Sequence, residues 1–247
     1  MKIVMLGATS GMGRAIARRF AERGETLFLL GHEPDELERS AADLSARAPD
    51  FRGNVGHAHC DLREPEGFKM ALCVAEKALG GIDTVIVTAA VFASQDQLEA
   101  DIDRTEELLR INFTNTVVFC EHARNTLLES GGGTLCVFSS VAGDRGRKPV
   151  ALYGAAKSGL STYLEALDHR YRSEGLNTIC VKPGFVKTGM TAGLKPPPFA
   201  GEPEQVAALV VRAIDRGTPM VYAPSIWRLI MLVIIHLPRF IMRRIGF

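Results

Sequence analysis

The sequence predicts an α/β protein with a doubly wound parallel sheet of about seven strands flanked by helices. Short apolar segments alternate with segments of helical periodicity along the whole chain. Residues 84–88 carry no charge, as expected for a strand that helices cover on both faces. With 247 residues, of which 47% are apolar and 23% charged, the chain is large enough for one domain with a substantial core.

Each expected element follows from apolar patterning bounded by glycine, proline or polar residues. The expected strands are residues 2–6, 26–30, 54–60, 84–88, 134–139, 178–181 and 220–222. The expected helices are residues 14–23, 34–47, 68–79, 98–128, 154–171 and 203–215. We expect one domain over residues 1–224, a mobile lid over the proline-rich residues 189–203, and an apolar and basic tail over residues 225–247.

A glycine-rich turn joins the first strand to the first helix. The turn contains Gly7, Thr9, Ser10, Gly11, Met12 and Gly13. Free backbone N–H groups and the helix dipole bind anions at such a place, and the glycines let a pyrophosphate approach. The turn therefore predicts a dinucleotide site of the Rossmann type, with a plain tight turn as the alternative.

The end of the second strand bears on which dinucleotide binds. A site for NAD usually has a carboxylate there, whereas this chain has Gly31 followed by His32. We therefore expect NADP(H), with NAD(H) as the alternative, and we expect His32 and Arg14 to contact the 2′-phosphate. Asp61 and Leu62 follow the third strand, where the carboxylate can reach the adenine amino group.

Tyr153 and Lys157 lie one helical turn apart and predict an acid/base pair. An ammonium at that distance favours the phenolate and lowers the pKa of a tyrosine, which is otherwise about 10. Ser140 follows the fifth strand and can hydrogen-bond the oxygen that gains charge when a carbonyl is reduced. In isolation this spacing is typical of ordinary surface and core residues, so the interpretation depends on the other motifs.

These motifs, taken in order, resemble the short-chain dehydrogenase/reductase family over nearly the whole chain. The resemblance implies that the catalytic residues are Asn112, Ser140, Tyr153 and Lys157. It implies that Asn112 positions a water that links Lys157 to solvent. It also implies that the cofactor contacts include Ala89, Tyr153, Lys157, Pro183, Gly184, Val186 and Thr188.

Two segments depart from the family pattern. Leu6 stands where a threonine usually precedes the first glycine, and residues 87–90 are Val-Thr-Ala-Ala where Asn-Asn-Ala-Gly is usual. Both changes are expected to remove polar stabilisation from the turns on the cofactor side and to leave the chemistry intact.

The last hundred residues are similar to decaprenylphosphoryl-2-keto-ribose reductases, in residues 139–145, 183–190 and 222–239. Those enzymes reduce a sugar ketone carried on a polyprenyl phosphate. The resemblance implies hydride transfer between NAD(P)H and a ketone or secondary alcohol of a lipid or lipid-linked sugar. The alternatives are a steroid, acyl or sphingoid ketone without a sugar phosphate, and a non-catalytic dinucleotide-binding regulator.

Composition and charge restrict the kinds of partner, location and metal that we expect for this protein. The net charge of +1 predicts no nucleic-acid partner. Five scattered cysteines indicate reduced thiols in a cytoplasmic protein, with the inner face of the membrane as a further location. His57 and His59 share one strand face without a third ligand, so no metal is expected. The family resemblance implies a homodimer or homotetramer formed through residues 98–128 and 153–171.

The tail and one loop carry most of the remaining chemistry. The apolar run 229–235 is too short to span a bilayer, but cations cluster on one side of the surrounding helix. We expect the tail to lie in a membrane interface, with packing on the domain or on a partner subunit as the alternative. The clustered cations are Arg228, His236, Arg239 and Arg243, and Pro238 is expected to kink the helix. Loop residues Arg145, Arg147 and Lys148 either receive an anionic group or form a solvated loop.

Overall fold

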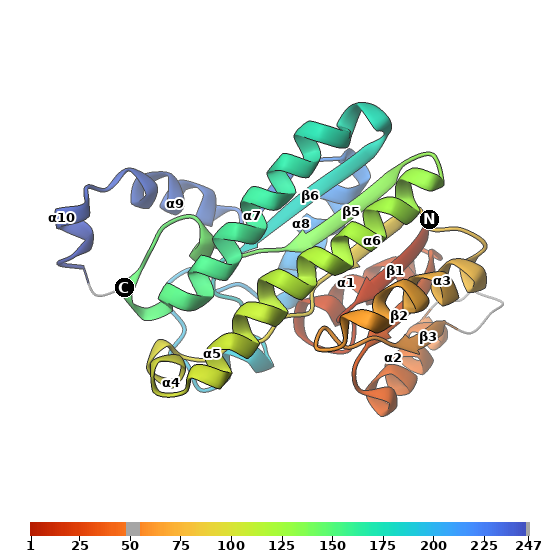
Figure 1. Ribbon diagram of the computed structural model, residues 1–247, viewed down its shortest axis with the longest axis horizontal. Coiled ribbons are helices and arrows are strands. Elements are labelled where there is room, and N and C mark those ends of the chain that lie inside the picture. Colours follow the sequence, from red (N-terminus) through yellow and green to blue (C-terminus); the bar gives the residue numbers. More distant parts are fainter. Residues whose placement is uncertain (48–54, 246–247) are drawn as a thin grey trace.

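Parallel strands form one sheet in the computed structural model, which describes residues 1–47 and 55–245. The strands are β1 (Lys2–Leu6), β2 (Thr26–Gly31), β3 (Gly56–His59), β4 (Thr84–Val87), β5 (Gly133–Phe138), β6 (Leu176–Pro183) and β7 (Met220–Ala223). Their order across the seven-stranded sheet is β3-β2-β1-β4-β5-β6-β7 (Figure 1). The predicted doubly wound parallel sheet is confirmed.

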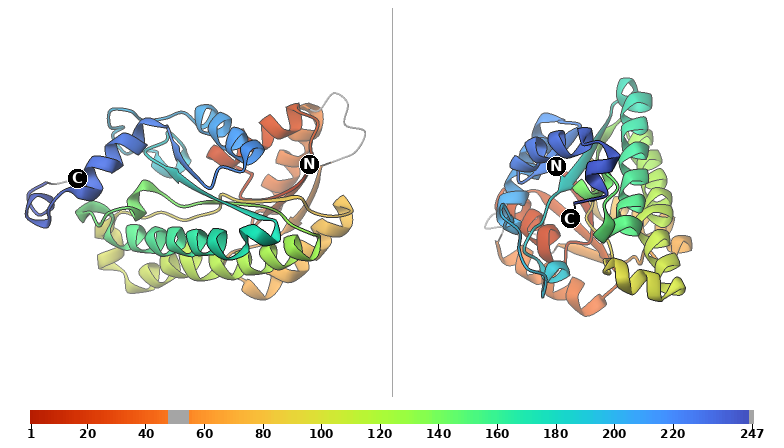
Figure 2. Two further views of the ribbon diagram at one scale, coloured as in Figure 1. Left: turned by 90° about the horizontal axis from the view of Figure 1, so that it is seen from above. Right: turned by 90° about the vertical axis from the view of Figure 1, so that its left-hand side faces the viewer.

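Helices cover both faces of this sheet, and Figure 2 shows the two helical layers from above. One layer contains α1 (Gly11–Glu22), α2 (Pro34–Arg47) and α8 (Pro203–Arg216). The other contains α3 (Phe68–Leu79), α6 (Thr116–Glu129) and α7 (Ala151–Tyr171). Side chains alternate between the two faces of a strand, so Ile3 and Met5 of β1 join one core while Val4 and Leu6 join the other. This double burial explains the uninterrupted apolar runs.

The strand order reverses at β1, which places a crevice at the carboxyl ends of β1 and β4. β2 and β4 both pair with β1, so Leu6 is beside Leu30 on one side and Val87 on the other. The connections that leave β1 and β4 pass to opposite helical layers and open a gap between them. Ligands of doubly wound sheets bind in such a gap.

The single helix expected over residues 98–128 is wrong. The segment contains α4 (Gln95–Ala100), α5 (Ile102–Leu109), a π-helical stretch (Arg110–Asn115) and α6. Asp101 separates α4 from α5, because its backbone is extended and its carboxylate accepts the N–H of Arg104. Aspartate favours this N-cap position over a helix interior.

Two helices begin earlier than expected, and both shifts affect the site. α1 begins at Gly11 instead of Arg14, so the glycine turn runs directly into the first helical turn. α7 begins at Ala151, which places Tyr153 in its first turn. The expected third strand began at Asn54, which lies outside the described residues.

The C-terminal tail forms two helices, α9 (Ile226–His236) and α10 (Arg239–Met242), beyond the end of the sheet (Figure 1). The expected kink at Pro238 is a complete break, because Leu237 is extended and the helix restarts after the proline. Met231 and Ile234 of α9 are buried against Val141. One face of the tail therefore packs on the domain, as the alternative interpretation expected. Among residues 1–47 and 55–245, no helix has the length and apolarity needed to cross a bilayer.

Candidate active site

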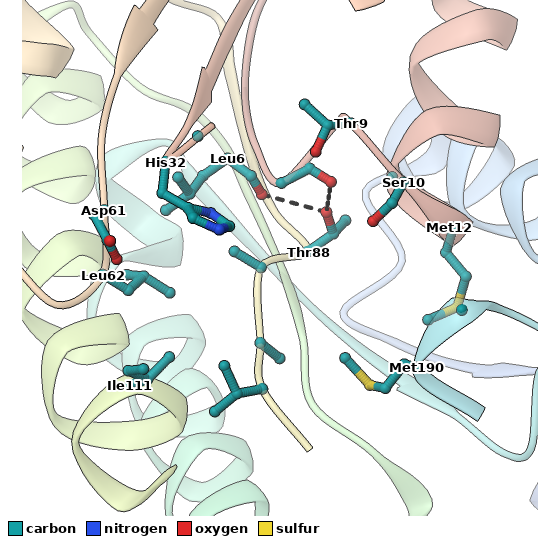
Figure 3. A pocket seen from close by; sticks show the side chains of 18 of the residues that line it. Leu6, Thr9, Ser10, Met12, His32, Asp61, Leu62, Thr88, Ile111 and Met190 are labelled. Atoms are coloured by element: carbon teal, nitrogen blue, oxygen red, sulfur yellow. Dashed lines mark hydrogen bonds between the residues drawn. The ribbon is translucent and has the colours of Figure 1, made fainter. Parts of the chain in front are cut away.

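A cavity of about 300 Å³ lies at the carboxyl ends of β1 and β4, and Figure 3 shows its lining. The predicted cofactor residues that line it are Gly7, Thr9, Ser10, Gly11, Met12, Gly13, Gly31, His32, Asp61, Leu62, Ala89 and Thr188. They come from the ends of four strands and from the segment after β6. The sequence motifs, which are far apart along the chain, therefore face one cleft.

The backbone of the glycine turn requires glycine at two positions. Gly7 has φ +96°, and a Cβ on it would lie 2.6 Å from the amide nitrogen of Ala89. A Cβ on Gly13 would lie 2.2 Å from the carbonyl oxygen of Gly7. The start of α1 therefore packs directly against the turn, and its first turn, which lines the cleft, contains no acidic residue. These features fit the pyrophosphate of a dinucleotide.

Thr88 ties this turn to the end of β4. Its hydroxyl donates to the carbonyl of Gly7 at 2.9 Å and lies 3.3 Å from that of Leu6, as the dashed lines in Figure 3 show. The Val-Thr-Ala-Ala segment therefore keeps a polar link to the glycine turn, and the expected loss of polar stabilisation relative to Asn-Asn-Ala-Gly stays a prediction. A threonine at this position supplies the hydrogen bond from the β4 side.

Of the two residues expected to contact the 2′-phosphate, His32 lines the cleft and Arg14 does not. His32 is exposed, and its Nε2 lies 3.6 Å from Glu33. The Arg14 guanidinium donates to the carbonyl of Thr9 and lies 3.6 Å from Glu36. Asp61 accepts the N–H of Arg63 at 2.9 Å, which fixes its carboxylate at the cleft wall. Both basic groups thus lie within 4 Å of a glutamate, whereas β2 itself ends on Gly31, without a carboxylate.

A second cavity of about 530 Å³ adjoins the first, and Met12, Thr88 and Thr188 line both. The remaining predicted residues that line it are Ser140, Tyr153, Lys157, Pro183, Gly184 and Val186. The three side chains of the predicted catalytic group therefore meet in one space beside the cofactor cleft. Most of the other lining residues are apolar, Phe92 and Val150 among them.

Burial sets the protonation of Tyr153. It raises the pKa of the phenol to about 12, and hydrogen bonding with Ser140 opposes that rise. The pKa of Tyr153 is thus raised where the sequence predicted a lowered one, and Lys157 is not among the causes of the shift, so an effect of Lys157 on Tyr153 stays a prediction. A phenol with this pKa is fully protonated at pH 7 and is available as a proton donor.

Lys157 lies beneath Tyr153 in the same cavity wall. Its side chain is buried, and Nζ donates to the carbonyl of Phe138 at 2.9 Å and lies 5.8 Å from the Tyr153 ring centroid. Burial lowers the pKa of this ammonium to about 8. The neighbouring Ser139 hydroxyl donates to the carbonyl of Lys157 at 2.8 Å, which holds this turn of α7 against β5.

Ser140 and Ser139 have different tasks although they are adjacent. The Ser139 hydroxyl is buried and lies 2.7 Å from that of Ser161, behind the cavity. The Ser140 hydroxyl lines the cavity, accepts the N–H of Ala142 at 3.1 Å and makes a long 3.5 Å contact to the carbonyl of Pro183, besides its hydrogen bonding with Tyr153. Ser140 and Tyr153 therefore face the same part of the cavity.

The side chain of Asn112 is committed to the backbone of Val91. Its Oδ1 accepts the Val91 N–H at 2.9 Å, and its Nδ2 donates to the Val91 carbonyl at 2.7 Å. Asn112 is fully buried in the π-helical stretch, so both amide groups have found partners. This pair of bonds fixes the segment after β4, which forms a wall of the cleft. A catalytic role for Asn112 stays a prediction.

Residues of the tail complete the second cavity, which the sequence did not indicate. Trp227, Ile230 and Ile234 of α9 line it together with the catalytic group. Trp227 packs directly on Gly184, where a Cβ would lie 2.1 Å from the indole nitrogen. The tail's apolar periodicity signals burial on one face, but no local pattern identifies what that face covers.

The fold and this site define an oxidoreductase with a dinucleotide cleft beside a tyrosine, lysine and serine group. A family model described as short chain dehydrogenase matches residues 1–198. The chain belongs to the short-chain dehydrogenase/reductase family, whose members use NAD(P).

Relatives agree with this membership, and solved structures agree with the fold. An uncharacterized oxidoreductase of Mycobacterium tuberculosis is 32% identical over 242 residues, which cover 98% of this chain and 96% of the relative. An uncharacterized oxidoreductase of Streptomyces coelicolor is 31% identical over 253 residues, covering 98% and 95%. The fold is similar to levodione reductase, with a TM-score of 0.79, 23% identity and coverage of 89% and 94%. It is also similar to a short-chain type dehydrogenase/reductase from Mycobacterium ulcerans, with a TM-score of 0.81, 20% identity and coverage of 89% and 86%.

Proposed function

We propose that this protein is an NADPH-preferring reductase of apolar ketones. The observation that carries the proposal is the protonated, partly buried Tyr153 at one wall of a mostly apolar cavity that adjoins the dinucleotide cleft. A non-catalytic regulator has no need of a proton donor and a hydrogen-bond donor that converge on a space of substrate size.

Each catalytic residue has one task in this proposal. A bound nicotinamide supplies the hydride. Tyr153, whose phenol is protonated at pH 7, donates its proton to the ketone oxygen. Ser140 donates a hydrogen bond to the same oxygen as its charge grows. Lys157 places a positive charge behind Tyr153 and favours the phenolate that remains after the transfer. The same residues would support alcohol oxidation in reverse.

The cavity lining favours a lipid ketone. Aliphatic and aromatic side chains from α9 and the segment after β6 surround the catalytic group. A lipid-linked sugar and a free steroid, acyl or sphingoid ketone both satisfy this lining. The test is NADPH oxidation by the purified protein with 2-butanone, 2-decanone and a prenyl ketone. We expect kcat/KM to rise with chain length, and equal rates for the first two ketones would contradict an apolar substrate.

The proposed preference for NADPH gives a prediction at Gly31. A Cβ there would lie 3.2 Å from the flexible end of Leu37, so Gly31→Asp can be accommodated by a small side-chain shift. The new carboxylate would repel the 2′-phosphate and accept hydrogen bonds from the ribose of NADH. We expect NADPH to bind the unmodified protein at least about tenfold more tightly than NADH, and Gly31→Asp to reverse that order. Fluorescence titration measures both dissociation constants, and equal values in the unmodified protein would refute the preference.

We further propose that the outer face of α9 lies in an anionic membrane interface. Leu229, Leu232 and Val233 are 61%, 58% and 63% exposed on the side opposite the packed Met231. Residues 225–247 contain no acidic side chain, and their cations complement anionic lipids. Truncation of the tail would also remove Met231 and the cavity wall, so substitution on the outer face is the cleaner test.

We expect Leu229→Ser/Val233→Ser to weaken sedimentation with phosphatidylglycerol vesicles at low salt at least about tenfold. The reason is the loss of two apolar side chains, each of which contributes about 1.5–3 kcal/mol when fully buried. The matched control is Met70→Ser/Val74→Ser, which removes two exposed apolar residues with the same spacing from α3. Failure of the unmodified protein to sediment would refute the membrane contact. Dissociation of an oligomer by the tail variant alone would assign this face to a partner subunit.

The family resemblance also favours a homodimer or homotetramer, formed through the outer faces of α5, α6 and α7. Ile102, Phe113 and Val118 are exposed apolar residues on this side of the molecule. Light scattering of the purified protein determines the number of subunits directly.

A further inference from the structure

A basic pocket of about 360 Å³ lies between the loop after β5 and the C-terminal tail. Its lining residues are Arg145, Gly146, Arg147, Lys148, Arg239, Met242 and Arg243. Cations from two distant parts of the sequence therefore face one space, and no acidic side chain lines it. Such a concentration of like charge is unfavourable unless an anion is bound.

Two of these cations join the two sides of the pocket by hydrogen bonds. Arg145 donates to the carbonyl of Leu237 at 2.7 Å, and Lys148 donates to the carbonyl of Arg243 at 2.6 Å. These bonds join the loop to the tail but use only a part of the donors that guanidinium and ammonium groups offer. The remaining N–H groups stay available to a ligand.

The acidic residue beside the loop does not neutralise the pocket. Asp144 binds Lys182 at 2.6 Å and the Tyr222 hydroxyl at 2.8 Å. Within the described part of the chain, none of the five cations of the pocket forms an ion pair. Among the described residues, Asp144 acts on Arg147 only at a distance, so the positive charge of the pocket is not neutralised by a direct ion pair.

Arg147 connects the basic pocket with the catalytic cavity, because its side chain lines both. Its Nε is buried and has no hydrogen-bond partner among the described residues. Burial also lowers the pKa of this guanidinium. A buried donor without a partner is unfavourable, and a charged acceptor at this position would satisfy it.

We infer that the basic pocket binds a phosphate group carried by the ketone substrate, while the apolar part of that substrate lies in the catalytic cavity. Several guanidinium groups can bind one phosphate through paired hydrogen bonds. A carboxylate has fewer acceptor oxygens and would leave some of these N–H groups without a partner. The inference rests on the proposed function at one point, namely that the molecule carrying the phosphate is a ketone substrate. Its test uses binding alone, so it succeeds or fails independently of ketone turnover.

The probe is decyl phosphate below its micelle concentration, with decanol and inorganic phosphate as comparison ligands. Trp227 is the only tryptophan of the chain and lines the catalytic cavity, so its fluorescence measures occupancy. We expect decyl phosphate to bind the unmodified protein at least about tenfold more tightly than decanol. We expect Arg239→Gln/Arg243→Gln to abolish that advantage while decanol binding stays unchanged, and Arg147→Gln to reduce the ratio of the two affinities.

The matched control is Arg228→Gln/Arg244→Gln, which removes the same charge from the tail outside the pocket. Full retention of the phosphate advantage in this control supports the pocket. Equal affinity for decyl phosphate and decanol, or an equal loss in the control, overturns it. Inorganic phosphate that binds as tightly as decyl phosphate overturns the link to the ketone substrate and leaves a site for free phosphate.

Discussion

Tyr153→Phe is expected to lower kcat about a thousandfold and to leave cofactor affinity within about twofold. The substitution removes only the phenol oxygen, the group that donates the proton, and general acids contribute factors of about 10²–10⁴. The ring stays in its edge-to-face contact with Phe92, where the centroids are 5.3 Å apart. Initial rates of NADPH oxidation with 2-decanone and fluorescence titration of NADPH measure the two quantities separately.

Tyr163→Phe is the matched control for this experiment. Tyr163 is on the same helix and donates to Glu121 at 2.6 Å, away from both cavities. Its loss removes a partly buried hydrogen bond without touching the site, so stability falls while kcat is retained. Activity of Tyr153→Phe within tenfold of the unmodified protein would exclude Tyr153 as the proton donor.

Lys157→Met is expected to lower kcat/KM at least about a hundredfold, because it removes the positive charge beneath Tyr153.

The same substitution is expected to change how the free energy of unfolding depends on pH. Burial lowers the pKa of Lys157 in the folded protein to about 8, below its ordinary value of 10.5. Between these values the unfolded chain binds more protons than the folded one, so the free energy of unfolding rises with pH.

The buried charge therefore destabilises the unmodified protein below about pH 8, and this cost is relieved as the pH rises. Between pH 7 and pH 10 the difference in unfolding free energy between the unmodified protein and Lys157→Met should move by about 3 kcal/mol in favour of the unmodified protein. Urea denaturation at both pH values measures it. Lys195→Met, at an exposed position, is the control. If the difference in unfolding free energy between the two proteins did not change with pH, burial would not lower the pKa of Lys157, and the prediction would be wrong.

Most of the fold was predictable because its signals are local. Apolar runs between glycine and proline boundaries identify buried parallel strands, and residues 2–6 and 68–79 match β1 and α3 without adjustment. The glycine turn was equally readable, because the close approach of Gly13 to Gly7 demands residues without a side chain. Residues 98–128 show the limit of such patterns. Apolar spacing in that segment continues across Asp101, and only the backbone geometry reveals that the helix stops there.

The environment of the candidate site was less predictable than its residues. Ser140, Tyr153 and Lys157 were identified from motif spacing, but the pKa of Tyr153 depends on removal from water by many distant residues. The contact between Asn112 and Val91 and the meeting of the loop after β5 with the tail are also long-range. No window of sequence contains both partners of such a contact.

Trp227 of the C-terminal tail packs against Gly184 and so brings the tail to the cavity of the candidate catalytic residues. Catalysis and substrate range therefore depend on different parts of the chain. The residues proposed to transfer the proton lie within the family-matched residues 1–198, whereas a wall of the cavity that they line comes from α9, which lies outside them. Catalytic power and substrate range can therefore change independently during evolution. Exchange of the segment after β7 between relatives is then a route to new selectivity on an unaltered catalytic apparatus.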